Sequence, residues 1–195
     1  AAFSAATLTQ TAGTGTTTFN AVTDTNAAGG ISLTGNAQTV NANLTTTNAG
    51  PVTFTNAGLL TLNANVVSDG AVTQNGAGAV TITGSRTVST TSDAVDFLRA
   101  VTLNGAGTTV AINTTAAGTG GNITFQDTLN ATTAGATAED LTLTAGTTGD
   151  ITFTGAVGQG ARLGDVTIAS ANNATVSAAF SAATLTQTAG TGTTT

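Results

Sequence analysis

The amino-acid sequence predicts an all-β protein, a parallel β-helix (β-solenoid) with irregular rungs of about 20 residues. Apolar residues alternate with threonine along most of the chain, as in Leu60–Leu62 (LTL) and Val80–Ile82 (VTI), which is the period-two pattern of a half-buried strand. Short segments rich in Gly and Asn, typical of tight turns, separate these strands. The composition, 39% hydrophobic but 4% aromatic with no Trp or Tyr, fits a narrow aliphatic core better than an immunoglobulin-like sandwich.

Strands are expected wherever the alternation recurs, either as a β-branched residue followed two positions later by Phe or as an aliphatic version of the same pattern. Each is expected to be about four to six residues long and to end at a Gly or Asn turn. The expected strands contain Ile31–Leu33, Val52–Phe54, Leu60–Leu62, Val80–Ile82, Val95–Phe97, Val101–Leu103, Val110–Ile112, Ile123–Phe125, Leu141–Leu143, Ile151–Phe153 and Val166–Ile168.

Two segments also fit a short helix. Ser92–Val101 (SDAVDFLRAV) offers either Ser92 or Asp93 as an N-cap, and it places Asp96 and Arg99 three residues apart. Its Val95–Phe97 triplet, however, matches the strand pattern, so a strand is favoured there. A second short helix candidate spans Ala136–Asp140.

The chain begins and ends with the same sequence. Ala1–Thr18 and Ala178–Thr195 both read AAFSAATLTQTAGTGTTT, so each letter recurs at an offset of 178 − 1 = 177. Composition bias does not produce so long a run of consecutive identities, so we expect a large tandem repeat; the alternative is an artificial duplication of the segment. Residues 1–177 are then one unit of a continuous β-solenoid, and residues 178–195 begin the next identical unit. One unit is expected to hold about nine rungs and to rise about 43 Å.

The start of the chain carries no initiator Met and no signal-like segment. Together with the repeated ends, this predicts that the sequence is an excerpt from a longer protein.

The charge content excludes several functions. The chain has three Arg, no Lys, nine acidic residues, a net charge of −6 and no His or Cys. A histidine general base, a thiolate nucleophile and a zinc site of the usual kind are therefore absent. Arg86, Arg99 and Arg162 are scattered, so no nucleic-acid partner is expected. No apolar run approaches the length of a membrane-spanning helix, roughly 18 residues or more, so no membrane span is expected either.

Two groups of acidic residues resemble catalytic carboxylates. Asp93 and Asp96 lie near Arg99, and Glu139 precedes Asp140. Paired carboxylates are what glycoside hydrolysis requires, but β-helix pectinases add a histidine-containing motif and basic residues that this chain lacks. We therefore expect solvated loop charges, no catalytic residues and no enzymatic activity.

No cofactor-binding or metal site is expected. Asp69, Asp150 and Asp165 lie near glycine turns, but the calcium-binding nonapeptide GGxGxDxUx does not occur. The phenylalanines are open to two interpretations, an exposed strip that stacks on carbohydrate or core filling; the alternation favours the core. They are Phe3, Phe19, Phe54, Phe97, Phe125, Phe153 and Phe180.

The segments Leu141–Gly158 and Leu163–Thr195 resemble the β-strand repeats of giant bacterial surface proteins of the filamentous-haemagglutinin and autotransporter-adhesin type. The resemblance covers essentially the whole chain. It implies a right-handed β-helix, secreted and used as a stalk, fibre or adhesin. The absence of Cys is also similar to proteins that are exported unfolded across an outer membrane.

The function expected from the sequence is structural: a segment of a long extracellular bacterial fibre, stalk or sheath, secreted or held at the cell surface. Its expected partner is itself, through end-to-end continuation or lateral assembly. One alternative is an adhesin stalk that binds a host or surface polysaccharide. Another is an ice-binding solenoid, because the T-x-T strings resemble threonine ladders, although their spacing along the chain wanders.

Overall fold

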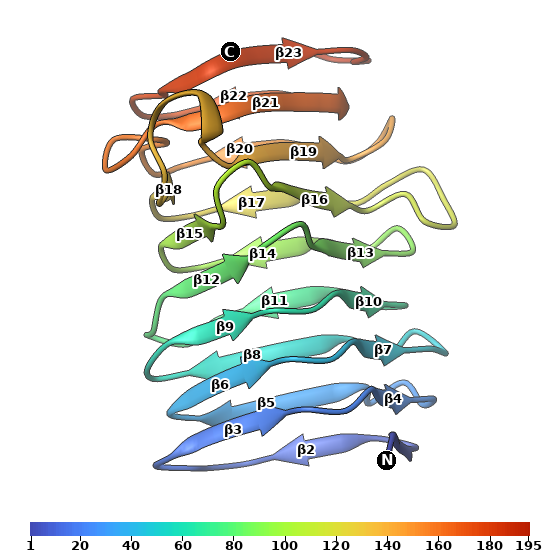
Figure 1. The fold of residues 1–195 in the computed structure, drawn as a ribbon. Coiled ribbons are helices and arrows are strands. Elements are labelled where there is room, and N and C mark those ends of the chain that lie inside the picture. The colour runs from blue at the N-terminus through green and yellow to red at the C-terminus, as the bar shows by residue number, and fades with distance from the viewer.

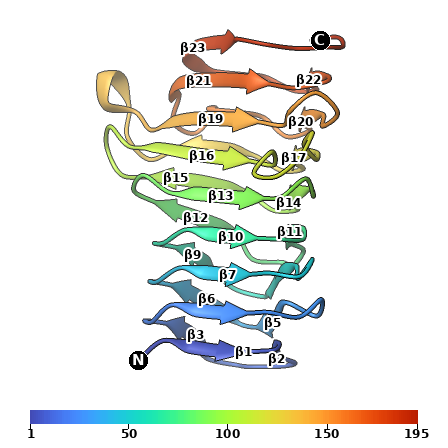
Figure 2. The same ribbon diagram turned by 90° about the vertical axis from the view of Figure 1, so that its right-hand side faces the viewer.

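A computed structural model describes residues 1–195 and shows a continuous β-solenoid of about eight turns (Figure 1). Each turn contributes strands to three parallel sheets that enclose a narrow interior. The first three strands run along one side, then the back, then the front of the stack as the chain rises, which gives the coil a right-handed sense (Figures 1 and 2). The predicted fold class is confirmed.

Strand order within each sheet follows the turns of the chain. Sheet A contains β1 (Phe3–Ala5), β4 (Thr23–Thr25), β7 (Leu44–Thr46), β10 (Val66–Ser68), β13 (Thr87–Thr90), β16 (Thr109–Asn113), β19 (Asp140–Thr144), β21 (Leu163–Ser170) and β23 (Ala182–Gln187). Sheet B contains β2 (Leu8–Gln10), β5 (Ile31–Gly35), β8 (Val52–Asn56), β11 (Val72–Gln74), β14 (Val95–Phe97), β17 (Ile123–Phe125), β20 (Ile151–Phe153) and β22 (Ala174–Val176). Sheet C contains β3 (Thr16–Phe19), β6 (Ala37–Val40), β9 (Leu60–Leu62), β12 (Val80–Thr83), β15 (Val101–Asn104) and β18 (Leu129–Ala131).

Equivalent residues of successive turns lie directly above one another. Val95 pairs with Ile123, and Ile123 pairs with Ile151, each across a parallel ladder. Because side chains alternate between the two faces of a strand, every second residue points inward and joins one apolar column. The core is a single cluster of 34 buried residues that runs through the stack.

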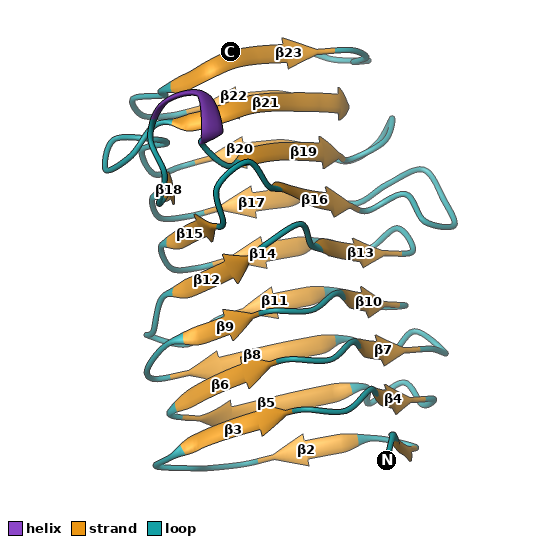
Figure 3. Ribbon diagram, viewed as in Figure 1, coloured by secondary structure: helices purple, strands orange, loops and turns teal.

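The turns vary in length. Leu163 pairs with Ala182, an offset of 182 − 163 = 19 along the chain, whereas Ile112 pairs with Leu143, an offset of 143 − 112 = 31. The average is about 22 residues, in agreement with the expected irregular rungs of about 20 residues. The chain makes about eight turns, where about nine per unit were expected. The extra residues form loops at the corners, chiefly residues 114–122 and 132–139, and leave the strands in register (Figure 3).

The two helix candidates have different outcomes. Val95–Phe97 is strand β14, as favoured. Near the second candidate the chain forms one turn of 3-10 helix, η1 (Gly135–Thr137), inside the 132–139 loop (Figure 3). No other helix is present, and none is long or apolar enough to cross a membrane.

Four phenylalanines fill the interior next to sheet B. Phe97 and Phe125 stack with ring centroids 5.6 Å apart, and Phe125 and Phe153 with centroids 5.4 Å apart and planes only 4° from parallel. Phe54 lies in the same inward column, two turns below Phe97, with Gln74 between them. All four rings are buried, which confirms the core interpretation for them.

Candidate functional site

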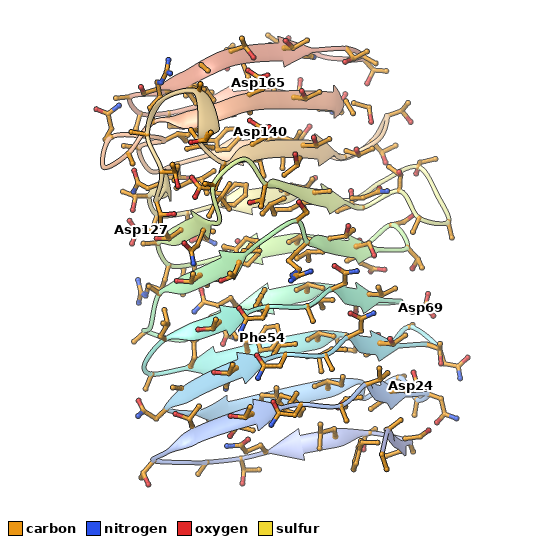
Figure 4. All side chains as sticks on the ribbon, in the orientation of Figure 1. Asp24, Phe54, Asp69, Asp127, Asp140 and Asp165 are labelled. Atoms are coloured by element: carbon orange, nitrogen blue, oxygen red, sulfur yellow. The ribbon has the colours of Figure 1, made fainter.

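The carboxylates are spread over the length of the solenoid. Figure 4 shows Asp24, Asp69, Asp127, Asp140 and Asp165 at different heights. Nowhere do three or more His, Cys, Asp or Glu side chains gather in a way that suits a metal ion. In the Asp93, Asp96 and Arg99 group, Asp93 and Arg99 are exposed, and Asp96 accepts hydrogen bonds from Gln126 Nε2 at 3.1 Å.

Glu139 is not a solvated loop charge as expected, because its side chain is fully buried. Oε1 accepts hydrogen bonds from the Gly105 amide at 2.9 Å and from the hydroxyls of Thr132 at 2.6 Å and Thr133 at 3.0 Å. Oε2 accepts from the amides of Thr132 and Thr133 at 3.2 and 3.0 Å. Burial alone would raise the pKa of this carboxyl, but the Thr132 hydroxyl and the Thr133 amide outweigh it and hold the pKa below its usual value.

The surroundings of Glu139 give it a structural role. Its carboxylate faces hydrogen-bond donors only and ties the start of the 132–139 loop to the turn below through Gly105. A buried charge without a cation is tolerated when several donors satisfy it. Glu139 therefore holds a long corner loop in place, while Asp140 N donates to the Thr108 carbonyl in the ladder.

Two of the aspartates near glycine turns tie adjacent turns together. The Ala49 amide donates to Asp69 Oδ2 at 2.7 Å and, with the Thr91 hydroxyl, lowers the pKa of Asp69. Asp150 Oδ1 accepts from Asn173 through both its side chain at 2.9 Å and its amide at 3.0 Å, and these bonds lower the pKa of Asp150. In both cases donors from a neighbouring turn bind one of the two carboxylate oxygens, Oδ2 of Asp69 and Oδ1 of Asp150.

Polar residues inside the solenoid were missed by the sequence reasoning. One set of small hydroxyl side chains points inward where sheet A turns into sheet B, and all but one of its members donate to turn carbonyls; Ser68 Oγ, for example, donates to the Gly50 carbonyl at 3.0 Å, whereas Thr25 Oγ1 has no partner. Sequence reasoning assigned threonine to the outside, although these positions share the inward parity of the neighbouring apolar residues. The buried members are Thr25, Thr46, Ser68, Thr90 and Thr114; Thr23 is also buried, but at the start of its strand, after the corner from sheet C to sheet A.

A second internal polar set lies where sheet B turns into sheet C. Asn56 Nδ2 donates to the carbonyls of Gly58 at 2.7 Å and Gly78 at 3.1 Å, and Gln38 Nε2 donates to the Leu33 carbonyl at 3.0 Å. The Gly58 and Gly78 carbonyls lie in turns between strands, and Asn56 supplies each with a donor; the Leu33 carbonyl belongs to β5. A shallow groove of about 320 Å³ lies outside this corner and is lined by small residues such as Gly35, Ala57 and Ala77.

The outer face of sheet C carries an uncharged column of hydroxyls in register across six turns. Its members pair in sequence up the sheet and have no charged residue among them. They are Thr18, Thr39, Thr61, Thr81, Thr102 and Asn130. Beside it, Asn41 Nδ2 donates to Asn20 Oδ1 at 2.7 Å and Asn63 Nδ2 donates to Asn41 Oδ1 at 2.8 Å, so an asparagine ladder links three turns.

Sheet B carries a similar outer column that spans eight turns. Its members are Thr9, Ser32, Thr53, Thr73, Asp96, Thr124, Thr152 and Thr175. The spacing of these residues along the chain is irregular, but they still pair in register from turn to turn. The corner loops contain the extra residues of the longer turns. The irregular spacing, which counted against a threonine ladder in the sequence, therefore does not break the register of the column.

Both ends of the solenoid leave strand edges without a partner. Strands β1, β2 and β3 have a neighbour on one side only, and so does β23 at the other end (Figure 2). Apolar side chains that the next turn would cover are exposed there: Phe3 is 44% exposed and Leu185 48%. Exposed parallel edges of this kind template the addition of further strands.

No family model, curated protein or solved structure matched this chain in the three comparisons that were made. The solenoid geometry, the outer columns and the open ends are therefore the observations on which a function is proposed.

Proposed function

We propose that this chain is a structural segment of a long fibre, stalk or sheath of a bacterial cell surface, built from tandem solenoid units that continue one another end to end. The observation that carries the proposal is that the two copies of the repeated sequence lie at opposite ends of one uninterrupted solenoid. The second copy extends the ladders of the first unit, since Leu163 pairs with Ala182 and Val166 with Leu185.

The interior supports a mechanical role. Parallel ladders join every turn to the next, and the core cluster runs through the stack without a break. In repeat proteins each unit contacts only its neighbours, so length grows by addition while the cross-section stays the same. The outer column of sheet C is polar without charge, and that of sheet B contains one charged residue, Asp96, which suits a shaft with a polar and nearly uncharged surface.

Electron microscopy of chains with one, two and three copies of the unit formed by residues 1–177 tests the proposal. The rod is expected to lengthen by about 37 Å per unit, from a little under eight turns at about 4.8 Å per turn. A matched three-unit chain with Val166→Asp in every unit is expected to lose the rod, because Val166 is fully buried in the column. Compact particles whose length does not depend on the number of units would contradict the proposal.

A second candidate function, adsorption to ice, is favoured by the in-register, uncharged column on the outer face of sheet C. A flat row of threonines repeated at the spacing between turns is the surface such binding requires. Inhibition of ice recrystallisation by the chain, and its loss in Thr61→Arg and Thr81→Arg on the uncharged face of sheet C, is the expected result. Equal inhibition by a Thr61→Arg chain and the unchanged chain would remove this candidate.

A further inference from the structure

We infer that consecutive repeat units are rotated by one face of the solenoid, so that the same sequence lies on a different sheet in each successive unit and returns to its first sheet after three. This inference rests on the proposed continuation of units and adds the geometry of the joint. The interaction surface is the upper edge of the turn formed by residues 157–176. Its partner is the repeated sequence that opens the next unit.

The first observation is the position of the repeated leucine. Leu8 pairs with Ile31 on sheet B, whereas its equivalent Leu185 pairs with Val166 on sheet A. The rest of the segment moves in the same direction: Phe3 lies on sheet A, but Phe180 bridges Val157 above the column of sheet C. From Phe3 to Phe180 the chain completes seven turns and two of the three faces of the eighth.

The segment keeps its own conformation in both places. Gln10 Oε1 accepts a hydrogen bond from Thr17 Oγ1 at 2.8 Å, and Gln187 Oε1 accepts one from Thr194 Oγ1 at 2.6 Å. The amide nitrogens of the two glutamines donate to Ala12 O at 3.3 Å and Ala189 O at 3.4 Å. The same corner is therefore built twice, once between sheets B and C and once between sheets A and B.

The inner faces permit this exchange. Leu8 and Leu185 both point inward, because each pairs with a buried aliphatic residue, Ile31 in one case and Val166 in the other. The in-and-out alternation is therefore preserved while the sheet changes. All three sheets present inward aliphatic side chains at the same strand spacing, so a strand of this sequence fits any of them.

Chain length excludes the unrotated joint. For Leu185 to add to sheet B as Leu8 does, it would have to pair with Ala174, at an offset of only 185 − 174 = 11. The shortest turn in the solenoid, such as that from Leu163 to Ala182, needs an offset of 182 − 163 = 19. The next face available to Leu185 is that of sheet A, where it is found.

One consequence concerns the surface of a fibre. Within one unit the longest corner loops, residues 114–122 and 132–139, each protrude at one corner only (Figure 3). A rotation by one face per unit places these loops at all three corners over three units. The fibre would then present the same features in three directions around its axis.

Cysteine pairs test the joint in the chain described here and in a chain of two full units, because neither contains a natural cysteine. Thr167 and Thr186 are paired, outward-facing residues of sheet A, and the geometry of adjacent strands suits a disulfide. Thr167→Cys with Thr186→Cys is expected to form a disulfide at least about tenfold faster than the matched pair Thr175→Cys with Thr186→Cys, whose positions lie on different sheets.

The outcomes separate this inference from the proposed function. Faster disulfide formation by the Thr175 and Thr186 pair, or none by either pair in chains that keep the β-sheet circular dichroism spectrum, would overturn the rotation. Rod length in the two-unit chain is measured in parallel. A rod of two-unit length with the Thr175 disulfide would leave the fibre proposal standing and remove only the rotated joint.

Discussion

Gln74 Nε2 donates a hydrogen bond to Asn56 Oδ1 over 2.8 Å, and both amide side chains are fully buried inside the solenoid. Gln74 also stands in the inward column of sheet B between Phe54 and Phe97. This polar pair inside a mainly apolar interior is tolerated because each amide donates to turn carbonyls at the corner, such as Gly78 O. The pair joins two consecutive turns by side chains as well as by the ladder.

Replacing Asn56 with Ala is expected to destabilise the chain by about 2–3 kcal/mol, because Gln74 and two turn carbonyls lose a buried partner. Urea denaturation followed by circular dichroism measures the change. Asn75→Ala is the control: Asn75 is exposed and receives one hydrogen bond, from Thr55 Oγ1, so a loss below about 0.5 kcal/mol is expected. Equal losses of stability in the two variants would show that the buried amide pair does not contribute to the stability of the chain.

The phenylalanine stack predicts a graded response at Phe125, which lies between Phe97 and Phe153. Phe125→Ala is expected to lower the free energy of unfolding by about 3–5 kcal/mol, because it leaves a cavity between the rings of the turns above and below. Phe125→Leu is expected to cost about 1–2 kcal/mol, since part of the volume is refilled. Phe3→Ala, at the open end where the ring is 44% exposed, is expected to cost under about 1 kcal/mol. A loss at Phe3 as large as at Phe125 would count against a continuous core.

The buried carboxylate of Glu139 predicts acid sensitivity. Its pKa in the folded chain lies below the ordinary value of 4.5, so its contribution to stability is complete above that value and is lost as the pH falls through the lowered folded pKa. Asp69 and Asp150, whose pKa values are also lowered, act in the same direction. The urea midpoint of the chain is therefore expected to fall as the pH is lowered from 5 towards 3.

Glu139→Gln separates the contribution of this residue. An amide in place of the carboxylate brings donors against the Thr132 and Thr133 amides, so stability at pH 7 is expected to fall by about 1–3 kcal/mol. The variant should then lose less between pH 5 and pH 3 than the unchanged chain does. Parallel pH profiles for the two chains would mean that Glu139 takes no part in the acid response.

Close contact between turns predicts that one glycine is indispensable at a corner. A Cβ on Gly78 would overlap the carbonyl oxygen of Gly58 in the turn below, so backbone rather than a flexible side chain would have to shift. Gly78→Ala is expected to cost about 2 kcal/mol or more. Gly15→Ala, where a Cβ would meet nothing within 4 Å, is the control and is expected to leave the thermal midpoint within about 2 °C. A stable Gly78→Ala chain would mean that the turns are less tightly stacked than the structure shows.

Strands were the part of the fold most easily predicted. Val95–Phe97 was favoured as a strand over a helix on its pattern alone, and it is β14. The apolar alternation also placed Phe54, Phe97, Phe125 and Phe153 in the core, where they are buried. These predictions succeeded because the side chains of a strand alternate by covalent geometry, whatever the strand pairs with.

Contacts between turns were the part that sequence reasoning missed. Glu139 looked like a loop charge because the groups that satisfy it, at Gly105, Thr132 and Thr133, meet only when the loop folds over the turn below. Thr46 and Ser68, which share a hydrogen bond at 3.1 Å inside the column, looked like any other hydroxyl residues of the alternation. Nothing local distinguishes them from the threonines of the outer columns except parity, which is set by where each strand begins.

The sequence by itself determined that the chain is made of short strands with one apolar face, that it lacks histidine and cysteine chemistry, and that Ala1–Thr18 recurs as Ala178–Thr195. Only the tertiary structure decided the length of each turn, the register of the threonine columns and the sheet on which the second copy lies. A two-residue alternation fixes which side of a strand faces the core. Which strand pairs with a given strand depends on the number of residues in the corner loops between them. That number is decided by pairings between residues some 20 to 30 positions apart.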